Sequence, residues 1–342
     1  MKKLILGFLS TFLLTLSTCS ENPVTDDTQP GRRDYEWTVD TIRHPAYRFW
    51  GSSPLDLWIT NTGDWDKSIS HFDGSQWTSY GVSGLIVPAA IYGFSSNNIF
   101  IGAENGKIWR FNGSNWELFA ELTKNGHNWI TFDNIWGESQ NNFYALGAHP
   151  DENGYANNAV IAHYYSGRWD MLNTDDLYGI VEHLYKNMSD NKIYIQVIGG
   201  REFTDSTHIY EFYQGRFTKL YSNVWTKGLQ ADISLIDSEV YFILGNEIVK
   251  RKNNRFHSFL QVNNPNFYQR IWGRSSKDIF LLMTDGLAHF NGSNIEYLFY
   301  FTYGDVTPWT QIYGAALFEN EVFFLVDEPP TGLSLVYHGT LK

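Results

Sequence analysis

Two groups of closely spaced carboxylates in this sequence could bind a metal ion. They occur as Asp64-Trp65-Asp66 and Asp151-Glu152, each in a short polar stretch between apolar segments. Carboxylate oxygens are the ligands that Ca²⁺ prefers, although neither stretch has the spacing of an EF-hand loop. We therefore take Asp64, Asp66 and Asp151 as weak candidates for a bound Ca²⁺, and we predict no other metal or cofactor.

Aromatic and arginine side chains in the same kind of stretch predict a binding surface. An exposed aromatic ring can stack on a sugar or anchor a protein partner, and a guanidinium can hold a carboxylate. The candidates are Trp65, Trp129, Trp225, Trp309, Tyr268, Arg201 and Arg270. Two other interpretations stay open: paired carboxylates could hydrolyse glycosidic bonds, or these stretches could be solvated loops without a further role.

The elements that must position these loops follow from a repeat. Its clearest copy is Ile271-Trp272-Gly273, then Asp278-Ile279-Phe280, then Ala288-His289-Phe290-Asn291-Gly292. Copies recur roughly every 40–45 residues, a spacing typical of β-propeller blades. β-Branched and aromatic residues predict inner strands packed on both faces, and Asn-Gly predicts a hairpin turn. The copies predict an all-β fold, a seven-bladed β-propeller of four-stranded blades.

The last copy is incomplete, and its missing strand is found at the other end of the chain. Leu335–Gly339 reaches the hairpin turn, but the sequence ends at Lys342 before a fourth strand. Tyr35–Val39 matches the fourth-strand segment Ser75–Ser79. We therefore expect the N-terminal segment to complete the last blade, which closes the ring and leaves no sheet edge open at the seam.

Many aromatic and histidine residues recur at fixed repeat positions, which predicts a structural role. The motif aromatics are expected to pack between blades, and they are Trp50, Tyr92, Trp136, Tyr185, Trp272 and Tyr313. The histidines His71, His163 and His289 also share one position. The binding candidates are accordingly drawn from outside the repeat.

The repeat resembles that of a bacterial propeller family with the pattern I-W-G-x-S-x-x-D-Φ-[FYW]…H-[FY]-[DN]-G-x-x-W, seen in exported proteins and lipoproteins. The resemblance covers roughly residues 35–342, and two central copies keep only the hydrophobic skeleton. It implies the propeller fold. It implies no substrate, because the family is functionally diverse.

The N-terminus predicts export and a lipid anchor. Lys2-Lys3 and the apolar stretch Leu4–Leu16 form a signal peptide over residues 1–18. Leu16-Ser17-Thr18-Cys19 resembles a lipobox, so Cys19, the one cysteine of the chain, is the expected lipidation site. Residues 19–34 are the expected flexible tether, and residues 35–342 the propeller. We expect a cell-envelope protein, anchored to the outer membrane and facing the periplasm or the exterior.

Composition excludes one class of partner. The chain has 37 acidic and 25 basic residues and no basic run that could serve as a nucleic-acid footprint. No catalytic motif is recognisable, so the expected function is non-catalytic binding of a protein or glycan partner by a monomeric propeller. The alternative is a glycan-active hydrolase or lyase with carboxylates near the central channel.

Overall fold

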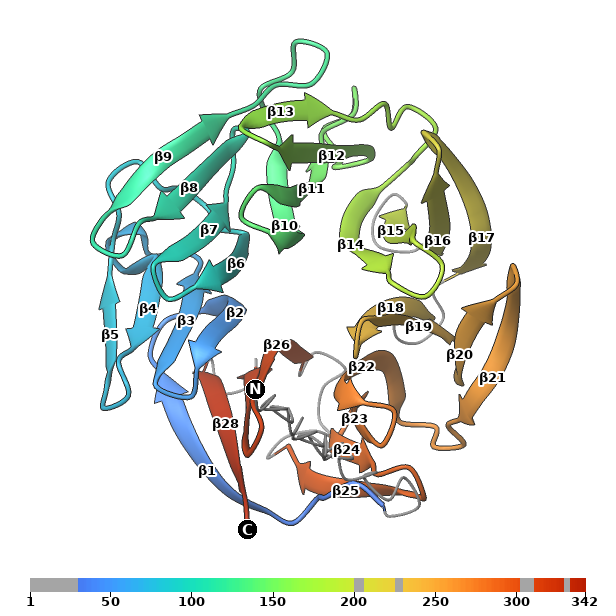
Figure 1. The fold of residues 1–342 in the computed structure, drawn as a ribbon. Helices are drawn as coiled ribbons and strands as arrows, with labels where there is room; N and C mark the ends of the chain where they lie inside the picture. Colours follow the sequence, from blue (N-terminus) through green and yellow to red (C-terminus); the bar gives the residue numbers. More distant parts are fainter. Residues whose placement is uncertain (1–29, 200–205, 225–229, 302–310, 329–332) are drawn as a thin grey trace, which may run out of the picture. The chain divides into compact units, whose positions relative to one another are not determined.

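The computed structural model describes residues 30–199, 206–224, 230–301, 311–328 and 333–342. Gly31–Lys342 form one compact unit. Within it the described strands make seven antiparallel sheets of four strands each, arranged around a central channel (Figure 1). The predicted seven-bladed β-propeller is confirmed, including the two copies in which only the hydrophobic skeleton is kept.

The blades are numbered in chain order, and each runs from an inner strand at the channel to an outer strand. Blade 1 is β2 (Ala46–Ser53), β3 (Asp56–Asn61), β4 (Ile69–Phe72) and β5 (Trp77–Tyr80), with a 3-10 helix η1 (Trp65–Lys67) between β3 and β4. Blade 2 is β6 (Ala90–Ser95), β7 (Asn98–Gly102), β8 (Lys107–Phe111) and β9 (Trp116–Glu121). Blade 3 is β10 (Thr131–Ser139), β11 (Asn142–His149), β12 (Asn158–Tyr165) and β13 (Arg168–Met171). Blade 4 is β14 (Ile180–Asn187), β15 (Lys192–Gly199), β16 (Ser206–Tyr213) and β17 (Arg216–Val224).

The remaining blades follow the same order up to the seam. Blade 5 is β18 (Ala231–Ile236), β19 (Glu239–Leu244), β20 (Glu247–Lys252) and β21 (Arg255–Gln261). Blade 6 is β22 (Phe267–Ser275), β23 (Asp278–Met283), β24 (Gly286–Phe290) and β25 (Ile295–Tyr300). Blade 7 is β26 (Gln311–Leu317), β27 (Glu321–Glu328), β28 (Leu333–Leu341) and β1 (Tyr35–Ile42).

The seam of the ring is closed by β1, as the sequence predicts. It pairs antiparallel with β28 over its full length, from Tyr35 opposite Leu341 to Ile42 opposite Ser334. The ring of Trp37 lies over Gly339, where a Cβ would meet it at 2.8 Å, and it packs edge-on against Phe299 of blade 6. The N-terminal strand is therefore both hydrogen-bonded and packed into the last interface.

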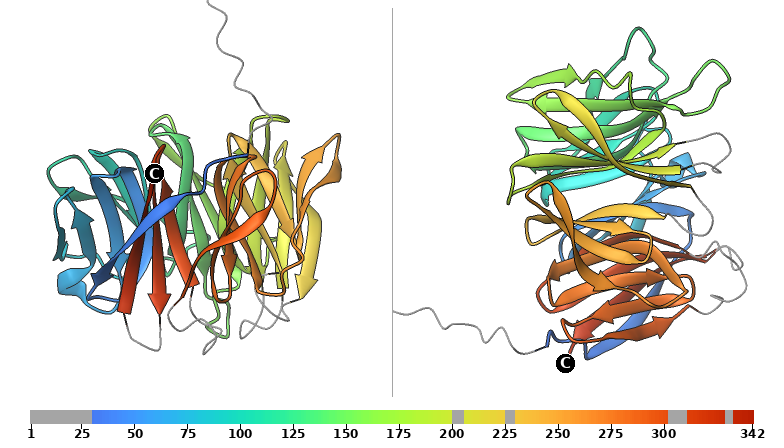
Figure 2. Two further views of the ribbon diagram at one scale, coloured as in Figure 1. Left: turned by 90° about the horizontal axis from the view of Figure 1, so that it is seen from below. Right: turned by 90° about the vertical axis from the view of Figure 1, so that its right-hand side faces the viewer.

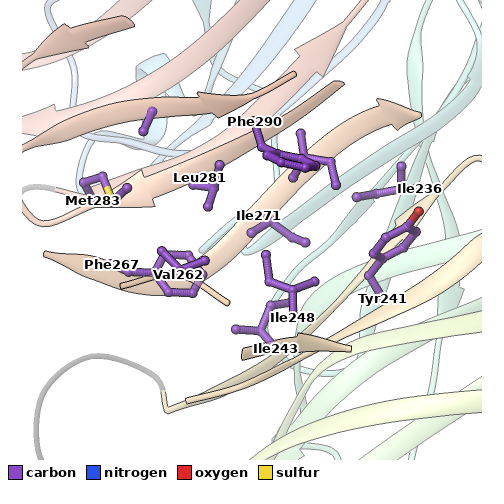
Figure 3. Close-up of a cluster of buried hydrophobic side chains, with 12 residues drawn as sticks. Ile236, Tyr241, Ile243, Ile248, Val262, Phe267, Ile271, Leu281, Met283 and Phe290 are labelled. Carbon is purple, nitrogen blue, oxygen red and sulfur yellow. The ribbon is translucent and has the colours of Figure 1, made fainter. Parts of the chain in front are cut away.

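The core is divided among the interfaces between blades. Figure 3 shows one such cluster, in which Ile243 and Ile248 of blade 5 face Ile271 and Leu281 of blade 6. The predicted packing role of the motif aromatics is confirmed at several interfaces. A Cβ on Gly93 would stand 2.5 Å from the ring of Trp50, so the motif glycine makes room for the aromatic ring of the preceding blade.

The repeated histidines are tied to the strand beside them. His71 Nε2 bonds Asp56 Oδ1 at 2.8 Å, and His289 Nε2 bonds Asp278 Oδ1 at the same distance. The ring of His71 also stacks on Trp58 at 3.8 Å. These contacts link neighbouring strands of one blade, which agrees with the structural role that the shared position predicts.

The strands run between two faces of the ring, visible edge-on in Figure 2. The face with the β3–β4 and β11–β12 loops and the interblade loops is called the loop face. The face with the two hairpin turns of each blade is called the turn face. Among the described residues, none forms a helix of the length and apolarity needed to cross a bilayer.

Candidate functional site

Two of the predicted tryptophans lie exposed on the loop face. Trp65, in η1 of blade 1, is 45% exposed, and Trp129, directly before β10 of blade 3, is 64% exposed. They belong to different blades and no contact joins them. Trp225, Trp309 and Arg201 lie outside the described residues.

Tyr268 and Arg270 are placed differently from the expectation that they belong to an interblade loop. Both lie within the inner strand β22, because this strand begins at Phe267, ahead of the Ile-Trp-Gly motif. The pairing register shifts between Phe267 and Ile271, so the chain bulges here. Arg270 consequently lines the central channel and does not stand on the rim.

Two of the three weak metal candidates, Asp64 and Asp151, serve their own turns, and the third, Asp66, is exposed in η1. Asp64 caps η1 by accepting the backbone N–H of Asp66 at 3.1 Å. Asp151 accepts N–H bonds from Asn153 and Tyr155 in the loop of another blade. Across the described part of the chain, no three His, Cys, Asp or Glu side chains gather as a metal ion would require.

A polar cluster in the channel brings together residues from five blades. The channel encloses a cavity of about 240 Å³ lined by the inner strands. Seven side chains are called the channel cluster: six that line the cavity, Arg48, Asn134, Glu182, His183, Asp232 and Arg270, and the buried Asp133, which interacts with Arg48 and Glu182. They come from β2, β10, β14, β18 and β22, which surround the centre of Figure 1.

Arg48 connects blades that are not neighbours. Its Nε donates to the backbone oxygen of Asp133 in blade 3 at 3.2 Å. Its Nη2 lies 3.5 Å from Glu182 Oε2 in blade 4. Blade 2 contributes nothing comparable, since Ala90 occupies the equivalent position. Arg48 therefore spans part of the channel and links blade 1 with blades 3 and 4.

Arg270 forms the second half of the channel cluster. Its Nε donates to Asp232 Oδ2 at 3.1 Å, and its Nη2 lies 3.4 Å from His183 Nε2. The amide of Asn134 donates to Nδ1 of His183 at 3.0 Å and to the backbone oxygen of Glu182 at 2.6 Å. Both of these partners are donors, and a neutral imidazole has one acceptor nitrogen, so His183 can accept from either Arg270 or Asn134 but not from both at once; Nε2 also lies 3.7 Å from Asp232 Oδ1.

Enclosure shifts the ionisation of the cluster toward neutral forms. Burial, reinforced by repulsion from Glu182, raises the pKa of Asp133 to about 8. Burial also raises the pKa of Asp232 to about 6, although the neighbouring Arg270 opposes this. Burial, with Arg270 and Arg48 nearby, lowers the pKa of His183 well below its usual value. At neutral pH the cluster thus holds two guanidinium–carboxylate pairs, a neutral imidazole and a protonated carboxyl group.

This arrangement can hold a small polar ligand or transfer a proton, and it also satisfies its own charges. Arg48 faces Glu182 and Arg270 faces Asp232, so each cation already has an anion beside it. A ligand that enters the cavity must therefore compete with existing pairs. Charge alone does not attract a partner to this channel.

Sequence reasoning found one member of the cluster, Arg270, and missed the rest. A signal was present: the residue directly before the first motif position is polar in most blades. The members at this position are Arg48, Asn134, His183, Asp232, Arg270 and Gln311. Bulges lie beside this position in β2, β10, β14 and β22, and the side chains of Arg48, Asn134, His183, Asp232 and Arg270 line the channel cavity.

Comparison with known proteins bears on the fold. No protein-family model matches the chain, and no curated protein matches it in sequence. The solved structure of YCF48 bound to a D1 peptide is similar with a TM-score of 0.59 at 14% identity, covering 90% of this chain and 99% of that one. YCF48 from Cyanidioschyzon merolae is similar with a TM-score of 0.58 at 11% identity, covering 88% and 98%.

A bacterial structure is similar to the same extent. The extracellular domain of the putative one-component system BT4673 from B. thetaiotaomicron has a TM-score of 0.56 at 12% identity, covering 89% of this chain and 40% of that one. At identities this low, the structural similarity establishes the shared β-propeller fold and nothing beyond it.

Proposed function

We propose that this chain is a non-catalytic cell-envelope lipoprotein that binds a protein or glycan partner through the loop face of its propeller. The observation that carries the proposal is the exposure of Trp65 and Trp129 on that face. A large aromatic ring left in solvent is a frequent anchor for a partner, because burying it on binding is strongly favourable.

The state of the channel supports binding over catalysis. In the channel cluster, each guanidinium is bonded to a carboxylate, and His183 is held neutral. These groups brace the inner strands against one another. The surfaces that differ most from blade to blade are the loops, where recognition is usually located.

YCF48, a different protein with a propeller of similar architecture, has been solved bound to a D1 peptide. At 14% identity this supports the capacity of the fold and says nothing about which peptide. For the loop face as a whole, the proposed partner is therefore a protein or a glycan.

Export and anchoring rest on the N-terminal sequence. The basic start Lys2-Lys3, the apolar stretch Leu4–Leu16 and the single Cys19 fit a lipoprotein signal. Metabolic labelling with a clickable palmitate analogue should mark the wild-type chain in the membrane fraction. The Cys19→Ser variant should be unlabelled, and an unlabelled wild-type chain would remove the lipid anchor from the proposal.

Partner binding is tested by capture from envelope extracts with the full-length chain in detergent. We expect wild type to retain a specific protein or glycan that the Trp65→Ala/Trp129→Ala double variant retains at least about tenfold less. The matched control is Leu55→Ala, which removes an equally exposed apolar side chain from the turn face. Equal capture by all three chains would contradict binding through these two tryptophans.

One observation favours the second function, a glycan-active hydrolase or lyase. Asp133 has a pKa of about 8 and lies near Glu182, so the pair could supply an acid and a base. Incubation of envelope glycans with wild type and with Asp133→Asn should then release reducing ends from the first only. Absence of release by wild type would leave the binding proposal standing alone.

A further inference from the structure

A polar groove crosses the loop face of blade 3, away from the channel. It consists of two adjoining cavities of about 260 and 290 Å³ that share Lys124, Asn125 and Asp175. Its walls come from the segments that flank the blade: the loop between β9 and β10, the ends of β11 and β12, and the loop between β13 and β14. The larger cavity could hold roughly ten water molecules, at about 30 Å³ each.

The floor of the groove is formed by a buried lysine whose ammonium group is hydrogen-bonded. Lys124 is 6% exposed, and its ammonium group donates to the backbone oxygen of Ala159 at 3.0 Å and to Thr174 Oγ1 at 2.6 Å. Its ion pair with Asp175 spans 3.6 Å. The hydrogen bond from Gly179 N–H to the Asn157 oxygen, at 2.7 Å, ties the third loop to the second. The walls are thus joined to one another through the floor.

The lining is rich in hydrogen-bonding groups that are not carboxylates, ammonium groups or guanidinium groups. Amide, hydroxyl and imidazole side chains surround Lys124, and they are Asn125, His127, His149, Asn158, Asn173 and Thr174. The one ammonium faces the carboxylate of Asp175. Burial lowers the pKa of His149, so its imidazole is neutral at pH 7. Nδ1 of His149 faces the backbone oxygen of Pro150 at 2.9 Å, which leaves Nε2 as an acceptor.

Exposed aromatic rings are carried by each of the three loops that supply walls of the groove. Trp129, Tyr155 and Tyr178 are exposed by 64%, 38% and 50%, and each is carried by a different one of the three loops. The rings of His127 and His149 stack on each other at 4.6 Å with an angle of 14°. Planar rings beside amides and hydroxyls provide the two contacts that a sugar needs, stacking on its C–H face and hydrogen bonds to its hydroxyl groups.

We propose that the groove of blade 3 binds an uncharged glycan segment, with Trp129 as the stacking residue. The inference rests on the proposed function and names the partner class for this part of the loop face. The balanced charge of Lys124 and Asp175 disfavours an anionic sugar, phosphate or acidic peptide, because an added anion would break the existing pair. A protein hot spot would require an apolar pocket, which these polar walls do not offer.

The experiment uses the full-length chain in detergent and a microarray of neutral glycans, followed by calorimetry with the strongest soluble oligosaccharide from it. We expect at least one neutral glycan to bind, and Trp129→Ala and His127→Ala each to weaken that binding by about tenfold or more. Tyr165→Ala is the matched control and should change the affinity by less than about twofold, because Tyr165 is 54% exposed and ends β12 on the turn face of the same blade. Circular dichroism should show an unchanged melting temperature for Trp129→Ala, since the side chain is exposed.

The outcomes separate this inference from the broader proposal. If no neutral glycan binds, or if Trp129→Ala binds as wild type does, the groove is not a glycan site. If envelope capture still depends on the loop-face tryptophans in that case, the proposed function stands and only the groove assignment falls. If capture fails as well, both are wrong.

Discussion

Arg48 provides the sharpest test of how the channel is held together. We predict that Arg48→Met lowers the free energy of unfolding by about 3 kcal/mol at pH 7. The side chain loses a charged hydrogen bond to the Asp133 backbone oxygen at 3.2 Å, a class worth about 1.5–3 kcal/mol. It also loses the pair with Glu182 at 3.5 Å, in which the two side chains are 17% and 18% exposed.

The second contribution lies between two limits. Exposed ion pairs contribute about 0–1 kcal/mol, whereas breaking a buried pair costs about 3–5 kcal/mol because a charge is left without its partner. The partial exposure and the long distance place the Arg48–Glu182 pair toward the lower limit. A loss of about 3 kcal/mol corresponds to several degrees in melting temperature for a domain of this size.

A double-mutant cycle in urea separates this pairing from general damage. If the mechanism is correct, Glu182→Gln in the Arg48→Met background should cost much less than it does alone, because the stranded carboxylate is neutralised. Lys186→Met is the control, since its pair with Glu138 at 2.9 Å is more exposed and should cost below about 1 kcal/mol. A loss under about 0.5 kcal/mol for Arg48→Met, or strict additivity in the cycle, would refute the reasoning.

Three further perturbations address ionisation, packing and closure. The pKa of Asp133 is about 8 in the folded state and near 4 when unfolded, so the folded state binds the proton more tightly and stability falls as pH rises from about 4 to 8. The free energy of unfolding of Asp133→Asn, relative to that of wild type, should therefore rise by at least about 1 kcal/mol between pH 5 and pH 8 in urea titrations. A difference between the two proteins that does not change with pH would contradict the raised pKa of Asp133. Gly93→Ala should cost about 1–3 kcal/mol in thermal unfolding, because a Cβ would stand 2.5 Å from the Trp50 ring, and Trp50→Phe in the same chain should recover part of it. A chain beginning after Ile42 lacks β1 and should associate in sedimentation experiments through the open edge of β28, whereas a chain beginning at Gly31 should sediment as the intact unit does.

The fold could be predicted because each blade repeats the same short sequence motifs, and each motif determines its own local structure. Three features recur in the motif: an aromatic residue, a polar residue before the second strand and a glycine in the outer hairpin. The structural effect of each is explained by the few residues around it. Gly74 and Gly292, for instance, adopt φ angles of 89° where the sequence predicts tight turns. Even the long-range closure by β1 could be predicted, since an incomplete last copy leaves one strand to be supplied.

The channel cluster could not be predicted in the same way. Whether Arg48 reaches Glu182 depends on the ring bringing blades 1 and 4 to opposite sides of one narrow channel, a distance that no local pattern encodes. Arg270 was selected for its chemistry and then assigned to the wrong element, because a bulge lengthens β22 toward the loop face. The groove of blade 3 was missed for a related reason: its walls are polar residues from three separate loops, ordinary when each is considered alone.

The closure of the ring has a mechanical consequence. Arg33 bonds the backbone oxygens of His289 and Asn294 and pairs with Glu296, and Gly31 bonds Asn291, so the chain enters blade 7 at the turn face, beside the hairpin of blade 6. A force on the N-terminus acts first on these contacts and then along β1 from Tyr35. When the force runs along β1, the ladder from Tyr35 to Ile42 is loaded in shear, so its residue pairs yield together and do not open one by one. A pull on the N-terminus is thus borne by the strand that keeps the ring shut.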